Sequence, residues 1–103
     1  MKISAQDLII KGITLEGRSF RPNDWADRLS SVLYSLDKGN RKGFLSCVQP
    51  VGLEGVKCVV VNKRLASLEP QAYRFLTEFA RDNDLQVEDG ENWVKTHPEA
   101  AAS

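Results

Sequence analysis

The sequence has 103 residues, with 14 Lys and Arg balanced by 14 Asp and Glu, so its formal net charge is zero. A chain of this length forms one domain that buries roughly 60–70% of its unfolded surface, and a 42% hydrophobic content argues against a disordered chain. No apolar stretch approaches the ~20 residues that cross a bilayer, and residues 1–7 lack the apolar region of a signal peptide. We therefore expect a cytoplasmic protein that does not enter a membrane.

The first predicted element is a strand at Leu8–Thr14, a mostly apolar run that is rich in β-branched residues. We expect residues 1–7 to form a flexible lead before it. Gly17 can take the positive φ of a tight turn after the strand. That turn leads into Ser19–Arg21, which is either an edge strand or an extended segment.

The first helix is predicted to start around Pro22, since proline suits the first helical turn and polar capping residues follow it. Five apolar residues recur on one face of this helix, and we assign this stripe to the core: Trp25, Leu29, Val32, Leu33 and Leu36. Trp25 has an alternative role in an exposed site near the helix N-terminus, where Arg18 and Arg21 are close in sequence.

The segment Asp37–Gly43 ends this helix and holds two glycines and three cations, a composition typical of a mobile turn. Its cations, Lys38, Arg41 and Lys42, make it the best candidate for a binding loop, although an ordinary solvated loop has the same composition. The segment does not match the phosphate-binding pattern GxxxxGK[ST] and does not lead from a strand into a helix. It is therefore not a recognisable nucleotide-binding motif.

A β-hairpin is predicted next. Phe44–Pro50 forms its first strand, and Pro50 places that strand at a sheet edge or terminates it, because proline cannot donate to a strand ladder. Val56–Asn62 is the densest β-branched run and predicts a central strand. Three consecutive valines within it must face both sides of the sheet, which suits a strand covered on both faces or flanked by neighbours in mid-sheet.

The hairpin register decides whether the two cysteines meet. A turn at Gly52-Leu53 places Cys47 opposite Cys58, whereas a turn at Glu54-Gly55 pairs Cys58 with Val51; the glycine position favours the second. Two cysteines without CxxC spacing, and a single histidine in the tail, do not suggest a zinc site or a disulfide scaffold. We expect no metal and no cofactor.

A single-turn or irregular connector at Lys63–Leu68 precedes a second helix that starts at Pro70. Its apolar face is predicted to pack on the sheet: Ala72, Tyr73, Phe75, Leu76, Phe79 and Ala80. Leu85–Glu88 alternates as a short final strand. Residues 89–103 are expected to form a mostly disordered tail, in which Trp93 either docks on the domain or belongs to a linear motif for a partner.

The order strand, helix, strand, strand, helix, strand is the split βαβ pattern (βαββαβ). It predicts a single α+β domain over residues 8–88, a ferredoxin-like or similar two-layer sandwich with two helices packed on a mainly antiparallel sheet. In a ferredoxin-like fold the first and third strands are central. Here those two are the most β-branched, the second carries Pro50 and the fourth is the shortest. Other α+β sheets with two helices on one face remain open.

Three stretches carry a family resemblance: GITLEGRSFRPNDWADRL at residues 12–29, GVKCVVV at 55–61 and EPQAYRFL at 69–76. They resemble a family of small, uncharacterised proteobacterial proteins, domain-of-unknown-function family 3579, over about residues 8–88. The resemblance implies a bacterial, cytoplasmic, single-domain α+β protein. The family has no assigned activity, ligand or catalytic residue, so no functional site is carried over from it.

The charge is distributed unevenly along the chain. Residues 1–64 hold eleven Lys and Arg against six Asp and Glu, whereas residues 65–103 hold three against eight. The first part therefore has a net charge of +5 and the second of −5. Such asymmetry marks either a basic binding face or two solvated surfaces that attract one another.

The sequence contains no acid/base pair, nucleophile triad or metal cluster of recognisable spacing. It therefore favours a small non-enzymatic binding or regulatory module that acts through a protein partner, as a monomer or homodimer. The first alternative is nucleic-acid binding, of RNA above all, through a basic face: Arg18, Arg21, Lys38, Arg41, Lys42, Lys63 and Arg64. The predicted central strands contain no aromatic residue, which argues against stacking of bases on the sheet. The second alternative is an enzyme or small-ligand sensor with a site near Trp25, Tyr73 or the cysteines.

Overall fold

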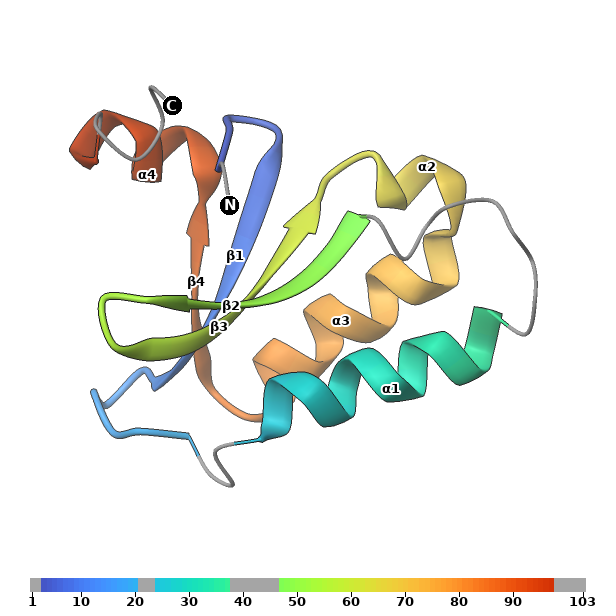
Figure 1. Cartoon of the computed structure of the whole chain (residues 1–103), viewed down its shortest axis with the longest axis horizontal. Coiled ribbons are helices and arrows are strands. Elements are labelled where there is room, and N and C mark those ends of the chain that lie inside the picture. The colour runs from blue at the N-terminus through green and yellow to red at the C-terminus, as the bar shows by residue number, and fades with distance from the viewer. Residues whose placement is uncertain (1–2, 21–23, 38–46, 98–103) are drawn as a thin grey trace.

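The computed structural model of the chain describes residues 3–20, 24–37 and 47–97, which form four strands and four helices (Figure 1). In chain order they are β1 (Asp7–Thr14), α1 (Trp25–Asp37), β2 (Val48–Leu53), β3 (Val56–Asn62), α2 (Leu65–Leu68), α3 (Pro70–Asp82), β4 (Leu85–Asp89) and α4 (Gly90–Thr96). The four strands form one sheet in the order β2-β3-β1-β4 with antiparallel pairs throughout. This is the predicted split βαβ arrangement, and the α+β two-layer fold is confirmed.

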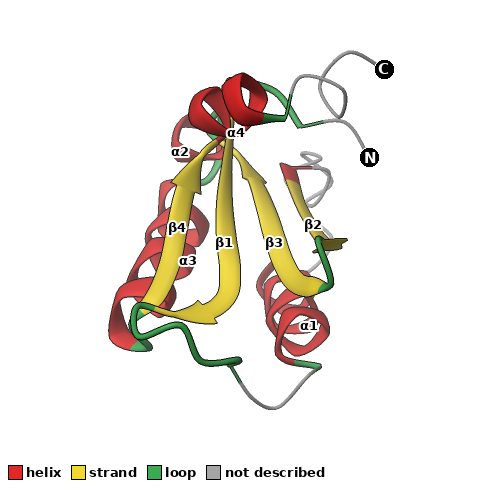
Figure 2. Ribbon diagram, turned by 90° about the vertical axis from the view of Figure 1, so that its left-hand side faces the viewer, coloured by secondary structure: helices red, strands yellow, loops and turns green. Residues whose placement is uncertain are grey.

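The strand order places β1 and β3 in the middle of the sheet and β2 and β4 at its edges, as Figure 2 shows. Asp7 pairs with Asn62 and Lys11 with Cys58, so the two most β-branched strands run side by side. Pro50 lies within β2, where its missing N–H can face outward from the edge. Position in the sheet thus follows composition, as the sequence predicted.

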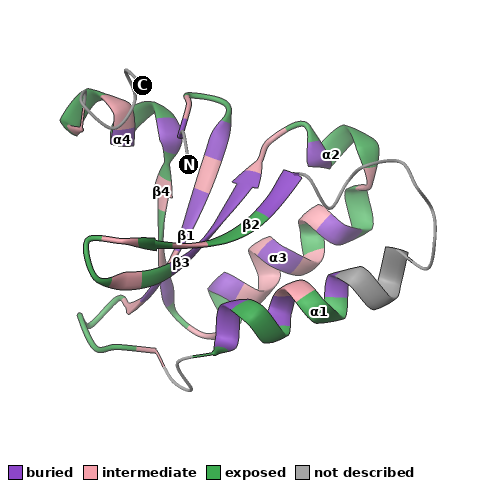
Figure 3. Ribbon diagram, viewed as in Figure 1, coloured by how far each residue is buried: buried purple, intermediate pink, exposed green. Residues whose placement is uncertain are grey.

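Helices α1 and α3 cover one face of the sheet and form the larger core with it (Figure 3). Fully buried residues from each layer meet there, among them Leu33 of α1, Val59 of β3 and Leu76 of α3. The predicted stripe of α1 is corrected at one position: Val32 is 45% exposed, because it lies at the rim of the helix face and not beneath it. The side chain of Leu36 lies outside the described residues.

The opposite face of the sheet carries a second, smaller core. Ile9 and Val60 project into it from the central strands, and Ile3 and Trp93 cover them, each with 3% or less of its surface exposed. The described structure includes packed residues outside the domain boundaries predicted at residues 8 and 88. Ile3 belongs to the folded domain, and residues 90–96 form helix α4 where a mostly disordered tail was predicted; residues 98–103 lie outside the described part.

The β2–β3 hairpin turns at Glu54-Gly55, and Val51 pairs with Cys58, which is the register favoured by the glycine position. Gly55 takes a φ of 81°, which glycine adopts without strain. The first strand of the hairpin, β2, extends to Leu53 and not only to Pro50. Residues 44–46 of its predicted range lie outside the described residues. Cys47 and Cys58 do not meet, because they lie in the cores on opposite faces of the sheet.

Polar contacts hold α4 at its start. Asp89 caps the helix by accepting a hydrogen bond from the Glu91 amide at 2.9 Å, and Lys63 Nζ lies 2.7 Å from Asp89 Oδ2. This pairing raises the pKa of Lys63 and holds the pKa of Asp89 below its usual value.

Within the described ranges, no helix is long and apolar enough to cross a membrane.

A second polar group ties α4 to the strands beneath it. Glu88 accepts from Asn92 at 2.7 Å and forms an ion pair with Lys11, also at 2.7 Å. Burial alone would raise the pKa of Glu88, but the hydrogen bonds from Lys11 and Asn92 outweigh burial and lower it. A carboxyl group with a lowered folded-state pKa stabilises the fold above its unfolded pKa, and this stabilisation is lost as the pH falls through the folded value.

We therefore expect the free energy of unfolding to decrease as the pH falls below about 4, with Glu88 contributing to the slope. Glu88→Gln should lower the free energy of unfolding by about 1 kcal/mol at pH 7 and flatten its acid-side decline. Urea unfolding between neutral and acid pH measures both effects. Glu16→Gln, at an exposed position, is the control, and identical pH curves for the two variants would contradict this role of Glu88.

Candidate functional site

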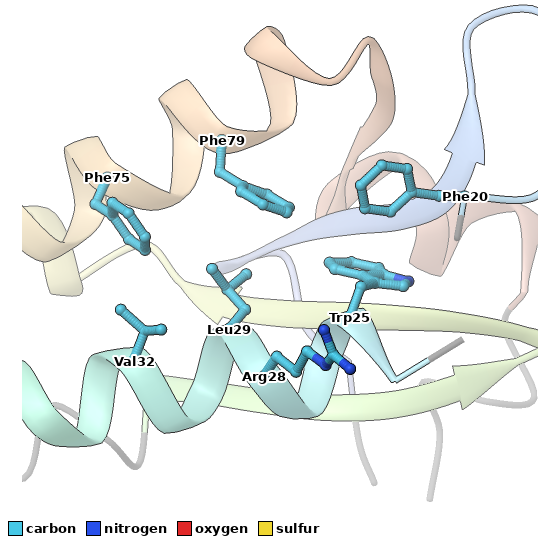
Figure 4. Close-up of a pocket in the computed structure, with 7 residues that line it drawn as sticks. All are labelled: Phe20, Trp25, Arg28, Leu29, Val32, Phe75 and Phe79. Atoms are coloured by element: carbon cyan, nitrogen blue, oxygen red, sulfur yellow. The ribbon is translucent and has the colours of Figure 1, made fainter. Parts of the chain in front are cut away.

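An apolar groove of about 260 Å³ lies between α1 and α3, on the helical side of the molecule (Figure 4). Its walls are mostly aromatic and aliphatic: Phe20, Trp25, Arg28, Leu29, Val32, Phe75 and Phe79. Phe75 and Phe79 were predicted to pack on the sheet. They do pack against the core, but they remain only partly buried because they also form the α3 wall of the groove.

Three aromatic rings form one end of the groove. Trp25 stacks on Phe79 with ring centroids 5.9 Å apart, and Phe20 meets both edge-on at 5.5 and 6.0 Å. Mutual contacts of this kind contribute roughly 0.5–1.5 kcal/mol per pair beyond area burial. The rings therefore hold one another in place, and the groove is a preformed feature of the fold.

The chain brings Phe20 to this site by folding back along β1. Thr14 accepts hydrogen bonds from the amides of Gly17 and Arg18, through its carbonyl and its hydroxyl respectively. Gly17 takes the predicted positive φ, 86°, and the Phe20 amide then donates to the Gly12 carbonyl at 2.9 Å. For Ser19–Arg21 the sequence predicts either an edge strand or an extended segment. Ser19 makes an isolated bridge to Ile13 of β1, and Arg21 lies outside the described residues.

A second hollow of about 300 Å³ adjoins the groove at its aromatic end. Phe20 and Trp25 line both cavities. The other walls of the second hollow come from β1, the hairpin turn and the segment before Phe20: Gly12, Ser19, Gly55, Val56 and Lys57. Two cavities of different polarity therefore meet at one tryptophan.

The groove carries little charge. Among the described residues that line it, Arg28 is the only charged one, and its Nε lies 2.9 Å from the Asp24 carboxylate one helical turn earlier. The lining offers no proton donor or acceptor suited to acid/base chemistry. The arrangement is suited to holding an apolar group.

Three of the basic candidates lie within the described residues, Arg18, Lys63 and Arg64, and they do not gather at one place. Arg18 follows the Thr14 end of β1, whereas Lys63 and Arg64 follow Asn62, which pairs with Asp7 at the other end of that strand. These ends are about 20 Å apart. Lys63 is also engaged by Asp89, while Arg18 and Arg64 are exposed.

The remaining basic candidates, Arg21, Lys38, Arg41 and Lys42, lie outside the described residues. A binding role for any of the seven stays a prediction. The sheet face that RNA-recognition domains use is here partly covered by Trp93 and Ile3, and its central strands present aliphatic residues such as Ile9 and Val60.

The cysteines are poorly placed for chemistry. Cys47 and Cys58 are buried, with 3% and 2% of their surfaces exposed. Burial raises the pKa of the Cys58 thiol, which lowers the fraction of reactive thiolate. Within the part of the chain that the structure describes, no three His, Cys, Asp or Glu side chains gather as a metal site.

The sequence pointed to Trp25 as an alternative site residue but did not indicate Phe20 or the groove. Helical periodicity identifies which residues of α1 and α3 are apolar, not how far apart the two helices lie on the sheet. The one available signal was an aromatic residue, Phe20, in a short segment of otherwise polar residues beside Trp25.

Comparison with known proteins identifies relatives of the chain but no activity. The sequence profile of a family described as a protein of unknown function, DUF3579, matches residues 4–90. A solution structure described as the first structural representative of its family is 34% identical, with a TM-score of 0.69 over 86% of this chain and 81% of the other. Among curated proteins, none matches the chain.

Proposed function

Because this chain belongs to the DUF3579 family of proteins of unknown function, we propose its role from its own geometry: a small non-enzymatic binding module that acts through a protein partner. The groove between α1 and α3 is the binding site in this proposal, and a bulky apolar side chain of the partner is its occupant. The bacterial origin and cytoplasmic location expected from the sequence belong to the same proposal.

The preformed aromatic end of the groove is the observation that supports this function. Binding energy at protein interfaces concentrates where a large apolar side chain fills a well-packed pocket, and aromatic residues are enriched at such positions. Trp25 and Phe79 supply a rigid stacked wall, so little ordering entropy is lost when an apolar group enters. Val32, 45% exposed, extends the apolar surface at the open side.

Nucleic-acid binding by the basic candidates remains the alternative. It has less support from the geometry, because Arg18 and Arg64 lie at opposite ends of the sheet and Lys63 is paired with Asp89. Salt-dependent binding of an oligonucleotide pool would favour it over the protein-partner proposal.

The test places a charge in the groove without disturbing the core. Val32→Glu should reduce retention of the partner on immobilised protein on the order of tenfold or more, because the carboxylate must be desolvated in an apolar pocket. Val87→Glu is the matched control, since Val87 is 47% exposed on β4 and does not line the groove. Proteins retained from a lysate of the source bacterium are quantified for wild type and both variants. Equal losses with the two variants, or none with either, would contradict the proposal.

A further inference from the structure

The indole N–H of Trp25 makes no hydrogen bond to another described residue, although most of the side chain is buried. Trp25 is 4% exposed as a whole, and its Nε1 is not among the wholly buried side-chain atoms without a partner, so this unpaired N–H reaches the surface of a cavity. An N–H that reaches a cavity unpaired is open to an acceptor from outside. Figure 4 shows the indole nitrogen at the end of the ring turned away from Leu29 and Val32.

The geometry around Gly12 locates this N–H at the second hollow. A Cβ on Gly12 would lie 2.9 Å from Trp25 Nε1, and Gly12 itself lines that hollow. The apolar surface of the indole therefore faces the groove, while its polar edge faces the neighbouring cavity. One residue presents a stacking surface to one site and a hydrogen-bond donor to the other.

Lys57 supplies a cation to the same hollow. It lies in β3 next to the hairpin turn, is exposed, and makes no ion pair with any described residue. Asp24, the residue before Trp25, pairs with Arg28 at 2.9 Å, and Glu54, three residues before Lys57, lies 3.4 Å from His97 Nε2. A donor and a cation that no described residue pairs thus line one small cavity, which is the complement of a carboxylate.

We propose that the partner's apolar side chain is accompanied by a carboxylate, and that Trp25 Nε1 and Lys57 Nζ bind this carboxylate in the hollow beside the groove. This inference rests on the proposed function. A partner segment lying across Trp25 reaches both cavities, because Phe20 and Trp25 line both. The acidic group selects among the many apolar segments that the groove alone would accept.

Two small probes separate the carboxylate from the apolar group: N-acetylphenylalanine and its amide, N-acetylphenylalaninamide. They are titrated at millimolar concentrations into the isotope-labelled full chain and followed by amide and indole chemical shifts. We expect the acid to bind about tenfold more tightly than the amide, the size of one charge-assisted hydrogen bond. Only the acid should shift the Trp25 indole signal downfield. The indole N–H of Trp93 is buried on the other side of the sheet and is the internal reference.

Substitutions of lysine test whether Lys57 causes the preference for the acid over the amide. Lys57→Gln should remove most of the preference for the acid, whereas Lys95→Gln, at an exposed cation on α4, should leave it unchanged. A preference that survives Lys57→Gln would overturn the role of Lys57. Equal binding of acid and amide, lost in Val32→Glu, would overturn the carboxylate inference while leaving the groove as a binding site. If neither probe shifted the signals of Leu29 and Val32, both the inference and the proposed function would fail.

Discussion

Gly12→Ala is expected to lower the free energy of unfolding by about 2–4 kcal/mol, although alanine is ordinarily harmless in a strand. The added Cβ would overlap the Lys57 carbonyl of the neighbouring strand and lie 2.9 Å from Trp25 Nε1. The carbonyl belongs to the sheet backbone and cannot move aside as a flexible side chain could. To relieve this overlap, either the central strands β1 and β3 must separate or the Trp25 side chain must move away from β1.

The matched control for this variant is Gly52→Ala in the neighbouring hairpin. Gly52 also lies in a strand, but a Cβ there meets nothing within 4 Å, so we expect a change within about 0.5 kcal/mol. Urea unfolding of both variants measures the difference. Because Trp25 forms a wall of the groove, Gly12→Ala should also alter the tryptophan emission of the folded state. Similar stabilities for the two variants would show that β1 and Trp25 tolerate the Cβ without strain.

The order of the strands was predictable because it follows from local composition. β1 and β3 are rich in β-branched residues and belong in the middle of the sheet, whereas Pro50 restricts β2 to an edge. The turn at Glu54-Gly55 was predictable for a similar reason, since glycine adopts without strain the positive φ that the hairpin turn needs. Each of these features depends on residues that are close in sequence.

The second core was predictable only in part. Three consecutive valines in β3 indicated that both faces of the sheet could be covered, and they are: Val59 and Val61 face the helices, and Val60 faces the other side. The sequence did not indicate what covers Val60. Helix α4 has seven residues, too few for a periodic apolar pattern, and Trp93 finds its partners in strands more than thirty residues away.

The groove was not predictable because it is a property of the distance between elements. Phe20, Trp25 and Phe79 come from a loop and two helices, and each was assigned separately as core or connection. Their convergence requires Gly12 to let the indole approach β1 and requires Phe20 to fold back onto the Gly12 carbonyl. Such contacts depend on the tertiary arrangement and leave no periodic pattern in the sequence.

The docking of α4 leads to the second large expected effect. Trp93→Ala should lower the free energy of unfolding by about 3–5 kcal/mol, the usual cost of truncating a buried aromatic residue. Trp93 is 3% exposed and packs with Ile9, Val60 and Ile3, and the His97 ring stacks on it with centroids 3.7 Å apart. The truncation would leave a cavity over the central strands and release the end of α4.

Chemical denaturation of Trp93→Ala, beside Lys95→Ala as an exposed control on the same helix, decides between the two roles that the sequence left open for this tryptophan. If Trp93 docks on the domain, only Trp93→Ala lowers the midpoint, and Trp93→Phe recovers part of the loss because a smaller ring still fills some of the space. If Trp93 instead belongs to a linear motif for a partner, both alanine variants unfold within about 0.5 kcal/mol of the wild type. That outcome would remove α4 from the folded domain and leave Ile9 and Val60 without their cover, as the predicted tail at residues 89–103 implies.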